Sequence, residues 1–260
     1  MPFQTSVDMY TDKGPVRENN EDSMGFLERP DTQHGVDGVY VVADGLGGHE
    51  KGEIASAMAV ELLIGALSHS TDEPLFPTSN HHFESHLAEL LLKINQEVCR
   101  VGLTGESMHR NPDRPGMATT LTTAVLIGGI IYIGHVGDSR AYLLRNGQII
   151  QITNDDTLVA EHVRKGTLTI QQASLYPSNV LTQAIGLDQP LTPFTTRLSI
   201  VDNDQVLLCT DGLHGFLKDK DILATIHQHP KQVASSLVDA AISGGSNDNI
   251  TTVAIRFTST

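Results

Sequence analysis

Short apolar segments rich in valine and isoleucine recur along the chain, separated by polar stretches that contain glycine, aspartate or asparagine. Such runs, about four to eight residues long, are typical of buried strands bounded by turns. The pattern predicts strands at residues 39–42, 121–127, 130–134, 141–144, 206–209 and 251–257. The dipeptides Gly128-Gly129 and Asn146-Gly147 favour two-residue hairpin turns, so we expect an antiparallel meander in the middle of the chain.

Helical periodicity marks three longer segments, residues 53–67, 83–101 and 231–242. In the second, residues such as Leu87 and Leu91 recur at helical spacing and form one apolar face. The predicted strands are grouped together, and so are the two long helices. This order favours an α+β fold with an antiparallel sheet core and outer helices over alternating parallel units.

Residues 155–190 form an insert between predicted strands. A helical segment, Leu158 to Lys165, closes on Gly166, and Thr169 with Gln172 resembles a capping box that opens another short helix. We expect this insert to act as a lid or recognition flap.

Two polar stretches that contain proline, 69–82 and 102–116, are predicted to be surface loops. No internal repeat or linker divides the sequence. We therefore expect one domain over residues 1–260, with 155–190 as a flap subdomain.

Acidic residues outnumber basic ones, 31 Asp and Glu against 17 Lys and Arg, for a formal net charge of −14. A nucleic-acid-binding protein needs a basic face for phosphates, so this charge speaks against that class. It would also repel a phosphorylated substrate unless bound cations reversed the local potential.

Cysteine content and apolar segments bear on the cellular compartment. Cys99 lies in a helical pattern and Cys209 in an apolar strand pattern, so we expect both to be buried rather than part of a disulfide framework. Residues 1–14 lack the basic and apolar regions of a secretory signal, and the most apolar stretch, 121–134, is too short and too interrupted by glycine to span a bilayer. These features predict a cytoplasmic protein in a reducing compartment.

Four acidic loops adjoin the predicted strands, and each also has an ordinary structural explanation. Asp44 in VVADGLGGH and Asp211 in VLLCTDGLHGF precede glycine, a pattern that fits a hairpin turn as well. Asp248 in GGSNDNITTVAI fits a polar loop before the last strand, and Glu21-Asp22 in RENNEDS fits a charged surface loop. Together these carboxylates could meet at one edge of a sandwich and form a site for a hard cation.

Oxygen ligands of this kind favour magnesium or manganese in octahedral geometry. The histidines, including His81-His82 in a polar loop, are not spaced with the carboxylates as a zinc or iron site would require. Two ions about 3.5–4 Å apart can clamp an in-line displacement at phosphorus and lower the pKa of a bridging water.

Gly45 and Arg17 add candidate chemistry beside the carboxylates. The glycines that follow Asp44 would let the Gly45 carbonyl approach a metal or phosphate. The guanidinium of Arg17 matches the oxygens of a phosphoryl group. The alternative for Arg17 is a surface ion pair with Glu18 or Glu21.

Six segments occur in order along the chain: RENNED, ADGLGGH, GMATTLTTAVL, HVGDSRAYLLRNG, LLCTDGL and GGSNDNITTVAI. Together they resemble the motif series of the metal-dependent protein phosphatases of type 2C, especially the bacterial stand-alone members. Any one motif is of modest specificity, but six in order are highly specific, and the resemblance spans Arg17 to Phe257. The resemblance implies a four-layer αββα sandwich of two antiparallel sheets flanked by helices.

The same resemblance implies a two-metal site that holds Mn²⁺ or Mg²⁺. Asp44 would bridge both ions, and the carbonyl of Gly45 would bind the second. Asp211 and Asp248 would hold the first ion.

The resemblance gives supporting roles to four further residues. Glu21 and Asp22 would act mostly through metal-bound waters, and Arg17 would bind the substrate phosphate. Asp138 in HVGDSR would lie near the site, with a hydrogen bond to the following turn as the alternative.

This sequence departs from the family pattern at several positions. Many bacterial relatives have an aspartate where Gly116 stands, so the resemblance does not extend to a third metal, and the nearby Asp113 offers no equivalent geometry. Leu46 replaces a histidine that acts as a candidate general acid in animal members, and His49 is not assigned that role. In the flap, Asp156 stands where relatives often have histidine.

The resulting hypothesis is a protein serine/threonine phosphatase in which a metal-bridging hydroxide attacks phosphorus directly, without a covalent phosphoenzyme. Neither Cys99 nor Cys209 is followed by the phosphate-binding loop of a cysteine phosphatase. The alternative is a catalytically silent phosphoprotein-binding regulator, a pseudophosphatase, although its expected signature is the loss of Asp44, Asp211 or Asp248. The resemblance implies phosphorylated proteins as partners, including a cognate Ser/Thr kinase and its substrates. We also expect a monomer, and the charge and the hydropathy of the chain predict that it binds neither nucleic acid nor membrane.

Overall fold

The computed structural model describes residues 3–32, 35–46, 51–68, 82–104, 117–177 and 179–260. Within these ranges the strands are β1 (Phe3–Asp12), β2 (Asp22–Glu28), β3 (Gly38–Asp44), β4 (Leu121–Ile127), β5 (Ile130–Val136), β6 (Arg140–Arg145), β7 (Gln148–Gln151), β8 (Phe194–Ser199), β9 (Gln205–Cys209) and β10 (Ile250–Ser259). The helices are α1 (Gly52–Leu67), α2 (Phe83–Thr104), α3 (Leu158–Arg164), α4 (Ile170–Ala173), α5 (Asp211–His214), α6 (Asp219–Gln228) and α7 (Val233–Ser243).

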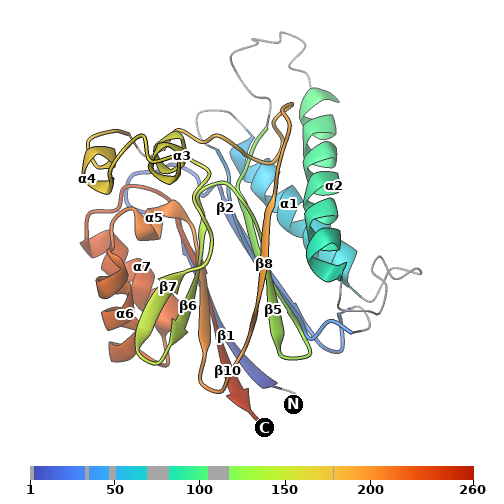
Figure 1. Cartoon of the computed structure of the whole chain (residues 1–260), viewed down its shortest axis with the longest axis vertical. Coiled ribbons are helices and arrows are strands. Elements are labelled where there is room, and N and C mark those ends of the chain that lie inside the picture. The colour runs from blue at the N-terminus through green and yellow to red at the C-terminus, as the bar shows by residue number, and fades with distance from the viewer. Residues whose placement is uncertain (1–2, 33–34, 47–50, 69–81, 105–116, 178) are drawn as a thin grey trace.

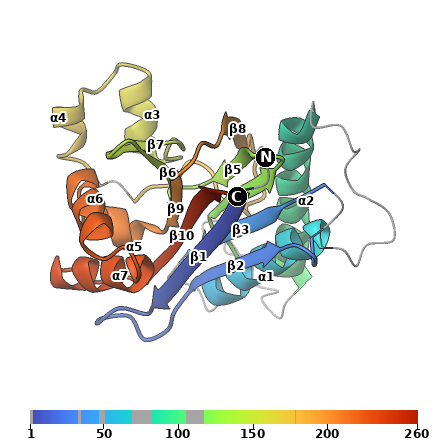
Figure 2. The same cartoon turned by 90° about the horizontal axis from the view of Figure 1, so that it is seen from below.

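Two five-stranded antiparallel sheets lie face to face, with helices on both outer faces (Figures 1 and 2). One sheet has the strand order β1-β10-β9-β6-β7 and is covered by α5, α6 and α7. The other has the order β2-β3-β4-β5-β8 and is covered by α1 and α2. The predicted α+β fold and the four-layer αββα sandwich are therefore confirmed.

Strand β3 shows how the layers divide the core. Val39, Val41 and Ala43 pack toward α1 and α2, whereas Tyr40 and Val42 point into the space between the two sheets. Successive side chains of a strand point to opposite faces, so a strand covered on both faces needs apolar residues at every position. This explains why the interior strands are continuous apolar runs in the sequence.

The predicted strands and hairpins are confirmed with small shifts of their ends. Hydrogen-bonded registers join Ile127 to Ile130 and Arg145 to Gln148 across two-residue turns. All four turn residues, Gly128, Gly129, Asn146 and Gly147, have positive φ between 53° and 83°, as the primed turns of tight hairpins require.

The predicted helices are also confirmed. In the insert, Gly166 follows α3 with φ of +69°, and Thr169 and Gln172 form the expected capping box of α4. Among the described residues, no helix combines the length and the apolar character that a membrane span requires.

Three expectations need correction. Residues 102–104 are the last part of α2 rather than a loop, while 69–81 and 105–116 lie outside the described residues. Cys209 is buried, but Cys99 is only half-buried because it lies on the edge of the α2 face that packs on the sheet. The hairpin alternative is wrong for both Asp-Gly pairs, since Asp44 closes β3 ahead of α1 and Asp211 opens α5.

Replacing Ile133 with alanine should destabilise the protein by about 2–5 kcal/mol, because this fully buried side chain of β5 packs between the sheets. Urea denaturation would measure the change. The control, Ile150→Ala on edge strand β7, removes a side chain that is 52% exposed and should cost less than about 1 kcal/mol. Equal losses for the two variants would contradict the assigned layers.

Candidate active site

The two sheets bring four predicted aspartates to one end of the sandwich. Asp22 opens β2 and Asp44 closes β3, and the two residues lie directly opposite each other in the β2–β3 register. Asp211 follows β9 and Asp248 precedes β10, so antiparallel pairing of these strands places both at the same end of the other sheet. A hydrogen bond of 2.8 Å from Thr210 Oγ1 to Asp22 Oδ2 connects the two halves.

Burial, with added repulsion from neighbouring carboxylates, raises the pKa values of Asp22, Asp44 and Asp211. Burial raises the pKa of Asp44 well above its usual range, and the charges of Asp22 and Asp211 raise it further. Burial also raises the pKa of Asp211, with a further increase from Asp248, although a hydrogen bond with Asp44 offsets part of the shift. Burial raises the pKa of Asp22 to about 7. Clustered carboxylates of this kind need a counter-charge.

Several donor atoms fit a hard divalent cation. Asp22 Oδ1 is buried and has no hydrogen-bond partner, which is costly for a carboxylate oxygen that nothing coordinates. In the described ranges, no three Asp, Glu, His or Cys side chains are arranged to hold a metal by themselves. A hard cation does not require such a set, because Mg²⁺ keeps several waters and accepts backbone carbonyl oxygens.

The backbone of Asp44 is fixed by two threonines that sequence reasoning did not single out. Asp44 O accepts hydrogen bonds of 2.8 Å from Thr120 N and from Thr119 Oγ1, and Asp44 N donates to Thr120 Oγ1 at 2.9 Å. Both threonines are fully buried. The sequence signal for these threonines was the presence of hydroxyl groups within an otherwise apolar segment. A buried hydroxyl needs a hydrogen-bond partner, so such residues are candidates for a structural contact.

Gly45 lies in a tightly packed loop beside Glu21. Its N–H donates to Glu21 O at 3.1 Å, and Ser56 Oγ donates to the same oxygen at 2.6 Å. A Cβ atom on Gly45 would lie 2.3 Å from Gly52 O and 2.6 Å from Glu21 O. Only glycine fits this position, which explains the Asp-Gly pair without a hairpin turn.

Arg17 contacts Asp248 rather than the neighbours that the sequence suggested. Its Nη2 lies 2.6 Å from Asp248 Oδ2, and the side chains are 43% and 27% exposed. The charges of Glu21 and Asp44 also favour the protonated guanidinium and raise its pKa. The ion pair with Glu18 or Glu21 is therefore replaced by one with a candidate metal ligand.

Asn249 is a further site residue that sequence reasoning missed. Its buried side chain accepts from Glu21 N at 2.8 Å and donates to Lys13 O and Asn19 O at 2.8 and 2.9 Å. These bonds join the loop that carries Arg17 to the loop that carries Asp248. Its place directly after Asp248 was the only sequence signal.

Asp138 lies at the edge of the cluster. Burial and the charge of Asp211 raise its pKa to about 7, and its carbonyl oxygen lies 2.9 Å from His214 Nε2. Asp138 also contributes to the raised pKa of Asp44, so it is near the site as expected.

The insert is attached to the sandwich beside Asp138. Asp155 forms a two-pronged ion pair with Arg140, at 2.6 and 2.9 Å. Asp156 is buried and accepts a hydrogen bond from Gly137 N at 3.1 Å, so it anchors the base of the insert.

The family departures can be placed only in part. Gly116, Asp113, His49 and His81 lie outside the described residues. Leu46 is described, and its N–H donates to Ala118 O at 3.0 Å, but its side chain cannot donate a proton.

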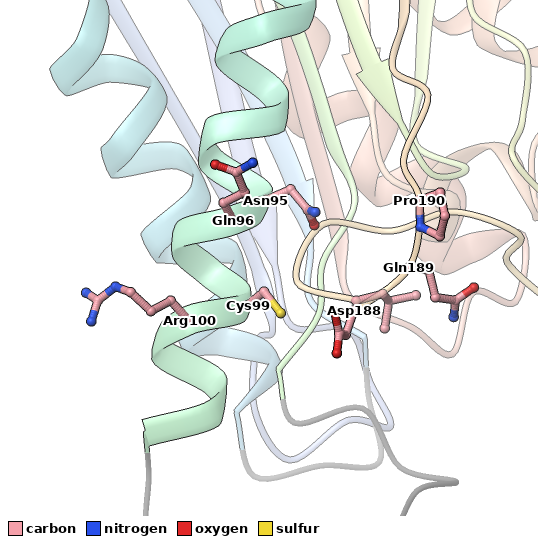
Figure 3. Close-up of a pocket in the computed structure, with 8 residues that line it drawn as sticks. Asn95, Gln96, Cys99, Arg100, Asp188, Gln189 and Pro190 are labelled. Atoms are coloured by element: carbon pink, nitrogen blue, oxygen red, sulfur yellow. The ribbon is translucent and has the colours of Figure 1, made fainter.

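A cavity of about 430 Å³ lies away from the carboxylates, between α2 and residues 187–190 (Figure 3). It is lined by Asn95, Gln96, Cys99, Arg100, Leu187, Asp188, Gln189 and Pro190. None of the candidate site residues contributes to it, so the chemistry of the acidic cluster is separate from this cavity.

Replacing Asn249 with alanine should destabilise the protein by about 2–3 kcal/mol, because two backbone carbonyls and one backbone N–H lose partly buried hydrogen bonds to its side chain. Chemical denaturation would measure the loss. The control is Asn19→Ala, which removes an exposed side chain but keeps the backbone carbonyl that Asn249 binds. A loss no larger than the control's would mean that Asn249 does not hold the two loops together.

Metal-free Asp44→Asn should be more stable than metal-free wild type, with a difference that grows as pH rises. An aspartate with a raised native pKa stabilises the fold below its unfolded pKa, and that contribution is lost as pH rises through the native pKa. Asparagine does not ionise, so the Asp44→Asn variant does not lose this stability as pH rises. Thermal unfolding in EDTA between pH 5 and 8 would measure the difference, with Asp239→Asn, on the exposed side of α7, as the control. A pH-independent difference would contradict the charge repulsion.

Comparisons with known proteins show which family this chain resembles. The family model described as Protein phosphatase 2C matches residues 17–242, a range that ends before Asp248. The serine/threonine protein phosphatase PstP of Mycobacterium tuberculosis is 36% identical over 94% of this chain, and the chain spans 43% of the length of PstP. The serine/threonine phosphatase stp of Listeria welshimeri is 34% identical over 96% of this chain and 95% of its own length.

Solved structures show the same fold. The S. agalactiae serine/threonine phosphatase has a TM-score of 0.84 and 29% identity, and the match covers 97% of this chain and 99% of that one. The catalytic domain of PstP in complex with two manganese ions has a TM-score of 0.78 and 30% identity, over 99% of this chain and 100% of that one. The chain belongs to the protein phosphatase 2C family.

Proposed function

We propose that this chain hydrolyses phosphoserine and phosphothreonine in proteins, using two divalent cations, Mn²⁺ or Mg²⁺, held by the acidic cluster. The observation that carries the proposal is the convergence of Asp22, Asp44, Asp211 and Asp248 at one end of the sandwich. Burial raises the pKa values of Asp44 and Asp211, and the charges of neighbouring aspartates raise them further. Family membership and the manganese-bound structure of the PstP catalytic domain support it.

Each site residue has a proposed part. Asp44 would hold both cations, with the Gly45 carbonyl on one of them and Asp211 and Asp248 on the other. Glu21 and Asp22 would contribute through water, which suits the unpartnered Asp22 Oδ1. When bound, such a cation pair supplies an activated water as nucleophile and neutralises phosphate charge.

The chain's own residues would orient the substrate and leave proton transfer to solvent. Arg17 would bind the phosphate oxygens through its two-pronged guanidinium. Solvent water would protonate the departing serine or threonine oxygen, since Leu46 offers no proton. No residue beside phosphorus is assigned as a nucleophile, so hydrolysis would take one step without a phosphoenzyme.

The proposal extends to the cellular setting. The substrates would be phosphorylated proteins, including a cognate Ser/Thr kinase and the proteins that it modifies. We place the reaction in the cytoplasm, in line with two cysteines in 260 residues, and assign it to a monomer with one catalytic domain. The pseudophosphatase alternative has no observation in its favour among the described residues, because the carboxylate set is intact.

The purified protein should hydrolyse a phosphothreonine peptide when Mn²⁺ or Mg²⁺ is present and stop when EDTA is added. Asp44→Ala should lower the rate about 100-fold or more, because the variant loses the carboxylate between the two cations. Phosphate release would report the rate.

The matched control for this assay is Asp239→Ala, which removes an exposed carboxylate from α7 and should retain full activity. Full activity of Asp44→Ala would remove Asp44 from the proposed site. Hydrolysis that persists in EDTA would contradict the dependence on cations.

A further inference from the structure

Arg17 has one guanidinium but two anions to bind. In the structure its Nη2 contacts Asp248 Oδ2 at 2.6 Å. The proposed function requires the same guanidinium to bind the substrate phosphate and requires Asp248 to hold a cation. While Arg17 Nη2 and Asp248 Oδ2 bind each other, the phosphate competes for the same nitrogen and the cation competes for the same oxygen.

The backbone around Arg17 is fixed on both sides. Asn249 Nδ2 binds Lys13 O and Asn19 O, four residues before and two residues after Arg17. At Gly14 the chain passes so close to Asp248 that a Cβ atom would lie 2.1 Å from Asp248 O. The loop position is therefore set, whereas the Arg17 side chain is 43% exposed and has room to change its direction.

Asp248 is also held in place. Its Oδ1 accepts a hydrogen bond of 2.8 Å from Asn249 N, so the carboxylate orientation is fixed and Oδ2 faces Arg17. Glu21 and Asp44 lie close enough to add to the attraction for the guanidinium. Arg17 thus supplies positive charge to the acidic cluster. Its backbone is held in place, whereas its side chain has room to change direction.

We propose that Arg17 exchanges between Asp248 and the substrate phosphate, with Asn249 as the positioning residue that holds the Arg17 loop against the Asp248 loop. A divalent cation at Asp248 competes with the guanidinium and releases it toward the position of the phosphate. In the metal-free protein the Arg17–Asp248 ion pair takes the place of that cation and keeps the guanidinium away from phosphate. Cation binding at Asp248 and phosphate binding by Arg17 therefore strengthen each other.

This inference rests on the proposed function. It adds one consequence, an effect of Arg17 on the affinity for the cation, which phosphate binding by Arg17 would not produce. If Arg17 only bound phosphate, its removal would leave the affinity for the cation unchanged when phosphate is absent. If Arg17 competes with the cation for Asp248, its removal tightens cation binding, because the two ligands of one carboxylate exclude each other.

The test is isothermal titration calorimetry of Mn²⁺ into the EDTA-treated, dialysed protein in a phosphate-free buffer. Arg17→Gln should lower the Kd for Mn²⁺ about threefold to fivefold, the range expected for release of an exposed ion pair. Metal-free Arg17→Gln should also melt at a lower temperature than metal-free wild type, and saturating Mn²⁺ should remove that difference. An unchanged or higher Kd overturns the exchange.

Two control variants show whether a change in the Kd for Mn²⁺ depends on the position and the charge of Arg17. Arg29→Gln removes an exposed arginine that pairs with Asp37 at 2.8 Å outside the site, and it should leave the Kd for Mn²⁺ unchanged. Arg17→Lys keeps the competing charge and should bind Mn²⁺ close to the wild-type Kd. A lysine variant that binds as tightly as Arg17→Gln would contradict competition by charge.

A measurement on wild type covers the case in which Arg17→Gln does not fold. The Arg17 Nε signal in ¹⁵N NMR, identified by its absence from Arg17→Lys, should shift when Mg²⁺ is added without phosphate. A signal that does not move at saturating Mg²⁺ overturns the exchange. Failure of the proposed function itself is a different result, namely no Mn²⁺-dependent phosphate release by wild type.

Discussion

Repulsion among carboxylates that the fold forces together is the constraint on which the rest of this structure depends. Asp22 and Asp44 are opposite each other in one sheet, and Asp211 and Asp248 adjoin paired strand ends in the other. The strands cannot separate these charges without breaking the hydrogen bonds of both sheets. A protein that keeps such a cluster must supply positive charge, and here the described contacts supply it through Arg17.

Rigid backbone contacts keep the cluster together. Thr119 and Thr120 fix the backbone of Asp44 from strand β4, and Asn249 joins the Arg17 loop to the Asp248 loop. These side chains are buried and hydrogen-bonded, so moving them would leave polar groups without partners. In the proposed exchange, the Arg17 side chain, which is 43% exposed, changes its partner without a change of fold.

Much of the fold could be predicted from the sequence because interior strands buried on both faces are continuous apolar runs. Elements with one exposed face were missed. Strand β1 alternates inward residues such as Val7 and Met9 with exposed ones. Helix α6 has only two buried residues, Ile222 and Ile226. Asp44, Asp211 and Asp248 were found because each adjoins an apolar run, and Glu21 and Asp22 were found through the RENNED motif. Thr120 and Asn249 were not, since their roles depend on contacts with residues more than 70 positions away, which no local pattern records.

Anomalous diffraction from crystals grown in Mn²⁺ tests the central claim most directly. The account predicts two manganese peaks among Asp44, Asp211, Asp248 and the Gly45 carbonyl, with a water oxygen between them. It is contradicted if the aspartates remain clustered in those crystals and no manganese lies among them.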